Sequence, residues 1–308
     1  MERIKFIAIV LVLFLSINNT FSQKTDLTLN LEKDKEYIHH LSSKSDIFQN
    51  YNGMEMNMEI SIKSDISYTV NEIVNDNYTM SVKYTGMSMT MNTPMGASEF
   101  DSESENEEDI VSSILKEMVN KPFTIILSKT GKVVEVKELE SMYSGVFDKL
   151  SSLPAQQQQQ MESQIRQAYG KEAFKGNIEM VMSIFPGNEV AVGETWTEKT
   201  NIESGMSAVA ISSYKLSEIN PDHILITGES EIKSENDKFA DTNGIPVKYD
   251  LSGDVISKVK VDPDTRWIIE ATVEQNIEGK IYIRPNQQVE EAMEVPMKVR
   301  NEILIEGR

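Results

Sequence analysis

Cysteine is absent from the 308 residues of this sequence, and proline and tryptophan are scarce, with 9 and 2 copies. Without cysteine, no disulfide bond can hold the fold together and no N-terminal cysteine can carry an acyl chain. Only 15 glycines accompany the few prolines, and 39% of the residues are apolar, which excludes a disordered or collagen-like chain. The composition therefore predicts a globular protein that is stabilised by an ordinary packed core.

Positive charge is also in short supply. The chain has 30 basic residues against 49 acidic ones, which gives a formal net charge of -19. Such a charge opposes attraction to phosphate backbones and to anionic lipid headgroups. We expect no nucleic-acid partner, and functions that need a basic surface are disfavoured.

Long apolar runs are confined to the N-terminus. Residues 6–17 form a nearly unbroken apolar segment that follows two basic residues and precedes small residues, including Ser22. This pattern is typical of a signal peptide, because the apolar segment is short for a membrane span. We expect residues 1–22 to be removed, leaving an exported chain of residues 23–308, periplasmic or secreted, with no further membrane span. A retained N-terminal anchor helix is the alternative.

The most distinctive pattern is an alternation of apolar and polar residues over residues 54–74. A period of two predicts a β-strand with one buried face, and this one is far longer than usual. At about 3.3 Å per residue it would extend roughly 70 Å, so we expect it to bend, with Ser64 as the bend. A turn at residues 75–77 leads to a partner strand in which the apolar phase switches at Gly86, as in a β-bulge. Together these features predict a strongly curved sheet.

The C-terminal part repeats this style. Alternating residues predict a second long hairpin, which joins residues 245–261 to residues 267–283 through a turn at Asp262-Pro263-Asp264. A last strand follows at residues 293–305 and contains Pro296, which cannot donate a ladder hydrogen bond, so we expect it at an edge of the sheet. Weaker hairpins are predicted around Asn220-Pro221-Asp222 and around Thr130-Gly131.

Helical periodicity occupies the middle of the chain. Apolar stripes at helical spacing predict four helices, at residues 107–119, 139–150, 154–169 and 174–185. We predict a β-rich α+β fold, in which long, strongly curved antiparallel strands enclose a helical block inserted at about residues 138–185. Residues 23–308 would form one domain with β parts at 23–137 and 186–308. A division into two β subdomains is the alternative.

Four segments carry a resemblance to a known family: "LTLNLEKDKEY", "GMEMNMEISI", "FTIILSKTGKVVEVKELE" and "FPGNEVAVGETW". With the signal peptide and the lack of cysteine, they resemble an uncharacterised family of secreted bacterial proteins known as a domain of unknown function. The resemblance implies no activity. More remotely, the architecture is similar to half-barrel lipoprotein carriers of the bacterial envelope, in which a bent sheet and helices enclose an acyl-chain cavity, a likeness of fold alone.

Methionines recur on the apolar side of the predicted strands, at Met54, Met56, Met58, Met80, Met87, Met89 and Met91. Each buried side chain of this kind contributes roughly 1.5 to 3 kcal/mol, so the stripes must be covered by protein or by a ligand. Core packing is the first interpretation. The second is a binding surface for apolar guests, because flexible thioethers adapt to variable shapes. Cu(I) ligation at M-x-M spacing is a third, although His39 and His40 are not obviously nearby.

Signals for catalysis are few. The chain has three histidines and no G-x-S-x-G elbow, phosphate-binding glycine loop or H-E-x-x-H helix. The acidic segment at residues 99–109 is interpreted as a solvated loop rather than a calcium site. We therefore expect a non-enzymatic exported protein, without cofactor or metal, that binds an apolar or amphipathic small molecule within a curved sheet. The alternatives are a protein-interaction module that uses its acidic surface or the edge strand at Pro296, and a hydrolase with a carboxylate pair.

Overall fold

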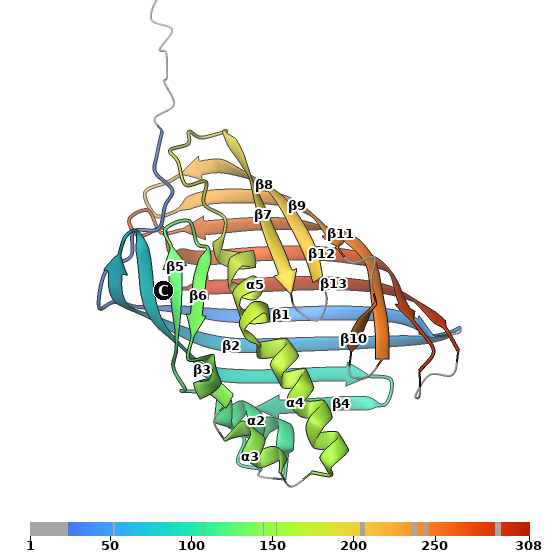
Figure 1. The fold of residues 1–308 in the computed structure, drawn as a ribbon. Coiled ribbons are helices and arrows are strands. Elements are labelled where there is room, and N and C mark those ends of the chain that lie inside the picture. The colour runs from blue at the N-terminus through green and yellow to red at the C-terminus, as the bar shows by residue number, and fades with distance from the viewer. Residues whose placement is uncertain are drawn as a thin grey trace, which may run out of the picture.

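The computed structural model describes residues 24–308 except 52, 107, 144, 152, 204–206, 236–238, 243–244 and 287–290. The predicted signal peptide, with its cleavage after Ser22, lies outside these residues. Within the described residues, thirteen antiparallel strands form one sheet in the order β6-β5-β3-β2-β1-β13-β12-β11-β9-β8-β7, with β4 paired to β3 and β10 to β11 (Figure 1). The β-rich α+β prediction is therefore confirmed.

The strands are long in the centre of the sheet and short at its edges. Their bounds are β1 Glu36–Tyr51, β2 Met54–Val74, β3 Asn77–Thr93, β4 Gly96–Asp101, β5 Phe123–Ser128, β6 Val133–Lys137, β7 Thr195–Glu203, β8 Ser207–Ile219, β9 Ile224–Ser234, β10 Ala240–Thr242, β11 Ile245–Val261, β12 Ile268–Ile283 and β13 Met293–Gly307. All the predicted hairpins are present, whereas β1, β4, β7 and β10 were not predicted.

β2 spans the whole alternating segment as one strand of 21 residues. Its ladder to β3 shifts register between Asp65 and Ile66, with Gly86 opposite, and a second shift follows near the end of the strand. A register shift of this kind is a β-bulge, which bends a strand and increases its twist. The bulge predicted at Gly86 is confirmed, and the irregularity in β2 lies beside Ser64 rather than at it.

β13 lies in the middle of the sheet, which corrects the prediction that Pro296 marks an edge. The strand pairs with β12 from Met293 onward and with β1 from Met297 to Gly307. Because the ladder to β1 ends at Met297, Pro296 lies just beyond its last rung and is not required to donate a hydrogen bond there. β6 and β7 end the main strand order, and β13 is paired on both sides from Met297 onward; only its first residues, Met293 to Pro296, pair with β12 alone.

The helices follow one another between β4 and β7, apart from the β5–β6 hairpin. They are α2 Ile110–Met118, the 3₁₀ turn η1 Leu139–Tyr143, α3 Val146–Leu150, α4 Ala155–Tyr169 and α5 Lys171–Met182. The single helix predicted over residues 139–150 is wrong, because Gly145 adopts a left-handed conformation (φ 89°) that divides it into η1 and α3. Its apolar stripe is nevertheless buried, with Met142, Val146 and Leu150 inaccessible to solvent.

The acidic segment is more ordered than the predicted loop. Residues 99–101 belong to β4, and Asp109 is the N-cap of α2. The Asp109 carboxylate accepts hydrogen bonds from the backbone N–H groups of Val111 and Ser112, which would otherwise have no partner at the helix start. The acidic character of this segment therefore serves partly to begin a helix.

Helix α5 lies against the concave side of the sheet and contacts both edge strands, β6 and β7 (Figure 1). Its Phe174 ring packs edge to face on Phe123 of β5, with centroids 4.6 Å apart. After the helix, the backbone carbonyl of Ile184 accepts a hydrogen bond from the Trp196 indole of β7. The helix thus fills the space between the two edges of the curled sheet, and the main hydrophobic core lies beneath it.

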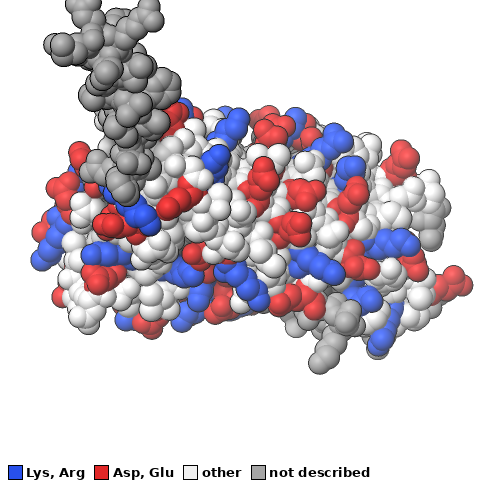
Figure 2. Space-filling model, turned by 90° about the horizontal axis from the view of Figure 1, so that it is seen from above, with Lys and Arg blue, Asp and Glu red and all other residues white. Residues whose placement is uncertain are grey.

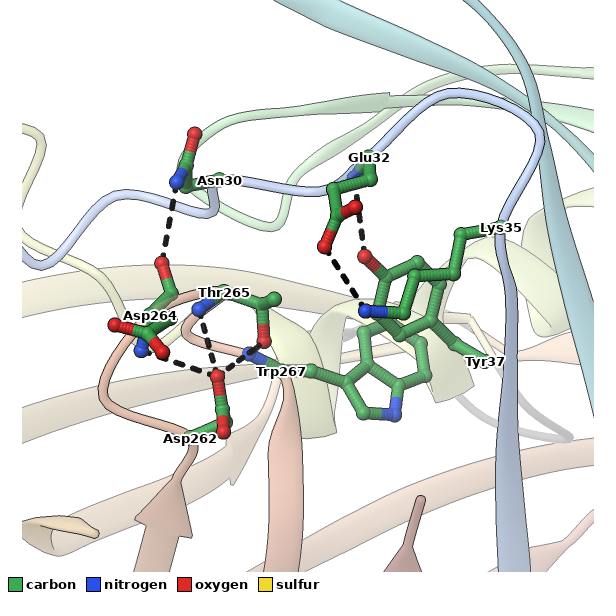
Figure 3. Close-up of polar contacts among 8 residues, drawn as sticks. All are labelled: Asn30, Glu32, Lys35, Tyr37, Asp262, Asp264, Thr265 and Trp267. Atoms are coloured by element: carbon green, nitrogen blue, oxygen red, sulfur yellow. Dashed lines mark hydrogen bonds and ion pairs between the residues drawn. The ribbon is translucent and has the colours of Figure 1, made fainter. Parts of the chain in front are cut away.

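The N-terminal segment closes one end of this half-barrel. Leu27, Leu29 and Leu31 are buried, and backbone hydrogen bonds tie the segment to the β5–β6 turn and to the β11–β12 turn. Asn30 contributes both its backbone N–H, which donates to the Thr265 carbonyl, and its side chain, which donates to the Asp264 carbonyl (Figure 3). We call this the closed end; it contains the start of β1 and the end of β13.

Candidate ligand-binding face

The two faces of the sheet differ sharply in charge. The register places every Asp, Glu, Lys and Arg of β1, β11, β12 and β13 on the outer face, where cross-strand ion pairs such as Lys44–Glu59 (2.6 Å) and Lys298–Glu278 (3.2 Å) form. Acidic and basic side chains are interspersed over the side of the molecule seen in Figure 2. The inner face of these strands, and of β2 from Met54 to Val70, carries none of these four residue types.

The inner face remains partly exposed away from the closed end. Several of its apolar side chains there are only half-buried, although the register gives them the same orientation as the core residues of the same strands; others, such as Val295 and Leu251, are buried. We call the half-buried set the distal face; it comprises Ile47, Met56, Met58, Ile60, Ile62, Met89, Met91, Ile277, Ile281, Met297 and Val299. Neighbours across the ladders include Ile60 with Met91, Ile47 with Met58, and Ile277 with Val299.

The seven methionines singled out by the sequence all project from this inner side but differ in burial. Met80 and Met87 belong to the core, at 0% and 5% exposure. Met54, at the end of β2, is 69% exposed. The other four are half-buried and belong to the distal face. The structure therefore divides the stripe into core methionines near the closed end and partly accessible ones beyond it.

The part of the concave side beneath α5 is filled. The cavity between this helix and the sheet, lined by Met180 and Val181 of the helix and by Val255, Val259 and Val273 of the sheet, has a volume of about 30 Å³. That is room for about one water molecule. The space beneath α5 therefore has no room for a small-molecule ligand.

A pair of amides interrupts the apolar inner face where the distal face meets the part covered by α5. Gln275 of β12 is buried, at 5% exposure, and its Oε1 accepts a hydrogen bond of 2.8 Å from Asn301 Nδ2 of β13. The other end of the Gln275 amide contacts Met180 Sδ of α5 at 3.6 Å, a weak acceptor. Asn301 Oδ1 is buried without a hydrogen-bond partner.

These amides were missed by the sequence reasoning, although a signal was present. Residues 273 and 277 of β12 and residues 299 and 303 of β13 are apolar and face inward, so Gln275 and Asn301 stand where the alternation calls for apolar residues. A polar residue at an inward position is costly unless it has a partner or a function. The register then brings the two interruptions together, because Gln275 pairs with Asn301.

The histidines do not form a catalytic arrangement. His39 is buried at the closed end, stacked on Trp267 with ring centroids 4.3 Å apart, and burial lowers its pKa from 6.5 to about 4. His40 is on the outer face and pairs with Asp65 at 2.5 Å. His223 lies in the β8–β9 connection beside Asp222. The described residues contain no group of three or more His, Asp or Glu side chains placed to hold a metal ion.

Two hollows on the outer face are poorer candidates for an apolar ligand. One of about 390 Å³ is lined by charges of both signs, including Glu231, Asp254 and Arg300. The other, about 690 Å³, is lined in part by Pro296 and includes Glu278 and Lys280 beside Phe48. Ionic side chains around both would have to lose water to an apolar guest. Among the helices of the described part of the chain, none is long and apolar enough to cross a membrane.

Comparison with solved structures gives distant likenesses only. A structure titled for lipid–protein interactions in lipovitellin aligns with 91% of this chain at 11% identity and a TM-score of 0.49, and the chain spans 26% of that much longer protein. The outer membrane protein OprG from Pseudomonas aeruginosa aligns with 92% of this chain and 99% of its own, at 6% identity and a TM-score of 0.26. A putative outer membrane lipoprotein-sorting protein domain from Vibrio parahaemolyticus aligns at 6% identity and a TM-score of 0.13, over 89% and 86% of the two chains. These likenesses concern the general sheet architecture alone.

Sequence comparison is more decisive for the family. No curated protein sequence matches the chain significantly. A family model described as "Family of unknown function (DUF6263)" matches residues 75–268, more than half of the chain. The match includes the β5–β6 hairpin and the segment leading into β7, two of the four segments on which the resemblance was noted, and leaves out the two N-terminal ones. The chain therefore belongs to the DUF6263 family.

Proposed function

We propose that this protein is a non-enzymatic, exported binder of an apolar or amphipathic small molecule, which it holds on the distal face. The observation that supports the proposal most strongly is the partial exposure of inward-facing apolar side chains on neighbouring strands, including Met58 of β2, Met91 of β3 and Val299 of β13. Nearer the closed end the same inner face is covered by α5 and the N-terminal segment. Together with the uncharged Ser43, Ser45 and Gln49 of β1, the partly exposed apolar side chains form a neutral, largely apolar surface of a kind that often marks a binding site.

The energetics favour a ligand of moderate size. Covering apolar surface contributes about 25 cal/mol per Å², so a guest that covers about 400 Å² would gain roughly 10 kcal/mol before the cost of association. Methionine side chains can adapt to guests of different shape, because they are unbranched and their thioethers are polarizable. The lack of room beneath α5 supports the distal face as the binding surface.

Export is the second part of the proposal. The apolar segment at residues 6–17 and the small residues before position 23 support it, and the absence of cysteine is compatible with any oxidising or reducing compartment. An exported protein with a neutral apolar face and a charged outer face can carry a poorly soluble molecule through water. The outer face, with charges of both signs, keeps such a carrier soluble.

The first experiment asks whether the protein holds a guest and where. Natively purified protein, prepared without detergent, is extracted with organic solvent and the extract is analysed by mass spectrometry. In parallel, binding of an apolar fluorescent probe is titrated to the wild type and to Met91→Lys and Asn92→Lys. Met91 faces inward, whereas Asn92 is exposed on the opposite face of the same strand.

We expect a co-purified apolar molecule and saturable probe binding, weakened about tenfold or more by Met91→Lys because a charge on the distal face must be desolvated. Asn92→Lys should bind the probe like the wild type. Loss of binding in both variants would argue against the distal face. An empty extract together with non-saturable probe binding in the wild type would refute the proposed function.

A further inference from the structure

The absence of charged side chains from the inner face indicates which headgroup a guest can have. Inward positions of β1, β11, β12 and β13 hold no Asp, Glu, Lys or Arg, and neither do those of β2 from Met54 to Val70. A carboxylate, phosphate or ammonium group placed on this face would lose water without meeting an opposite charge. The only basic side chain at an inward position of these strands is His39, which is buried at the closed end and has a lowered pKa.

The amide pair of Gln275 and Asn301 places hydrogen-bonding groups at one position on the inner face. Asn301 Nδ2 is used by Gln275 Oε1, and Gln275 Nε2 is directed at Met180 Sδ, so Asn301 Oδ1 is left as an acceptor without a donor. Exchanging the oxygen and nitrogen of both amides would leave one amide group of the pair without a good partner in the same way. A buried amide group without a partner is destabilising and is retained where something satisfies it.

The position of the pair fits a ligand headgroup. Asn301 is half-buried and pairs with Ser45 across the ladder to β1; along β13 its inner-face neighbours are Val299, toward the distal face, and Ile303, toward the part covered by α5. A guest whose chain lies on the distal face, over Met297 and Val299, would therefore place one end at the amides. There it would meet Asn301 Oδ1, the buried acceptor that has no donor among the described residues.

From these observations we propose that the distal face selects an uncharged amphiphile, such as a long-chain alcohol or a neutral lipid, whose hydroxyl or amide group donates a hydrogen bond to the Asn301–Gln275 pair. The inference rests on the proposed function and deepens it. It excludes ionised fatty acids and cationic amphiphiles as preferred ligands. The exclusion of charged guests follows from the uncharged inner face. The expected hydrogen bond follows from the amide oxygen that has no partner.

The first arm of the test compares guests that share one alkyl chain. Dodecanol, dodecane, dodecanoate and dodecyltrimethylammonium compete with a bound apolar fluorescent probe on the wild-type protein at neutral pH. We expect dodecanol to compete at a concentration about tenfold or more below that of either charged guest. The distal face and the amide pair offer no opposite charge to offset the cost of removing water from a charged headgroup. Equal competition by dodecanoate and dodecanol would overturn the inference and leave the proposed function standing. Failure of all four guests, and of the probe, to bind would refute both.

The second arm removes the amides. Gln275→Leu with Asn301→Leu should weaken dodecanol binding about fivefold, the size of one neutral hydrogen bond, and leave dodecane binding within about twofold. Asn276→Leu is the matched control, because Asn276 is the exposed neighbour of Gln275 on the outer face of β12. Thermal unfolding of each variant checks the fold. Unchanged dodecanol affinity in a folded double variant would overturn the role of the amides. If the double variant does not fold, the comparison of charged and uncharged guests on the wild type still tests the inference.

Discussion

At the scale of single residues, the closed end depends on an aromatic cluster that contains a neutral histidine. His39 stacks on Trp267 and meets Tyr68 edge to face, with centroids 5.5 Å apart. Its Nε2 lies 3.2 Å from the Ile268 carbonyl, which ties β1 to the start of β12. Burial lowers the pKa of His39 to about 4, because the charged ring would lose its water. The cluster is therefore built for the neutral imidazole.

This cluster predicts a specific loss of stability in acid. An unfolded His39 would bind a proton below its ordinary pKa of 6.5, whereas the folded one does so only below about 4. The unfolded state thus holds more protons in this window, so the free energy of unfolding falls as pH decreases from 6.5 to 4, by about 3 kcal/mol. Urea unfolding across this range should show the fall in the wild type and a smaller one in His39→Leu. His223→Leu, in the β8–β9 connection, should retain it; an identical pH dependence in wild type and His39→Leu would contradict the assignment.

At the scale of secondary-structure elements, the β5–β6 hairpin is fitted closely to the end of α5. Gly131 in the hairpin turn adopts φ 79°, and a Cβ atom built there would lie 1.8 Å from the Met182 carbonyl oxygen of the helix. Val133, the first residue of β6, donates its backbone N–H to the Glu179 carboxylate of α5 at 2.9 Å. The turn is thus shaped by the helix it touches as well as by its own backbone.

A pair of glycine substitutions separates these two effects. Gly131→Ala should destabilise the protein by about 3 kcal/mol or more, because it adds a steric clash to the cost of a left-handed alanine. Gly193→Ala has a similar backbone (φ 93°) and open space around its Cβ, so it should cost only about 1 to 2 kcal/mol. Chemical unfolding of both variants measures the difference. Equal losses of unfolding free energy would show that the helix end at Met182 moves away from the added methyl group without a further loss of stability.

At the scale of the whole molecule, α5 joins the two free edges of the sheet. On one side Glu179 accepts from the backbone of β6. On the other side α5 contacts β7, and the two edges are also linked directly, because Lys132 in the β5–β6 turn forms an ion pair of 2.9 Å with Glu198 of β7. These links hold the ends of the curled sheet around the helix, so the curvature of the concave side depends on them as well as on the bulges.

Breaking one link should loosen the edges before the centre. Glu179→Leu leaves the Val133 N–H without its partner, and we expect a loss of about 1 to 2 kcal/mol in stability. Hydrogen exchange should become faster in β6 and β7, while β1 and β13 remain protected because their ladders are paired on both sides. Glu172→Leu, on the exposed surface of the same helix, is the control. Uniform acceleration in every strand would mean that the edges do not open separately.

Much of the architecture could be predicted because local sequence patterns determine it. The two-residue period marks the long strands, the phase change at Gly86 marks the bulge, and the Asn75-Asp76 turn follows from residues that tolerate the left-handed conformations found there (φ 49° and 61°). The split of the helix predicted over residues 139–150 could not be predicted in the same way. The stripe continues through Gly145, and only the conformation of that glycine divides it.

The alternating sequence by itself determined that this chain forms long curved strands with one apolar face, because the alternation of side chains along a strand is a local property. Which part of that face is core and which part is open was decided only by the tertiary structure. Strand order brings β13 between β1 and β12, places Gln275 beside Asn301, and lets α5 and the N-terminal segment cover Met80 but not Met58. These relations join residues far apart in the chain, and no local pattern specifies them.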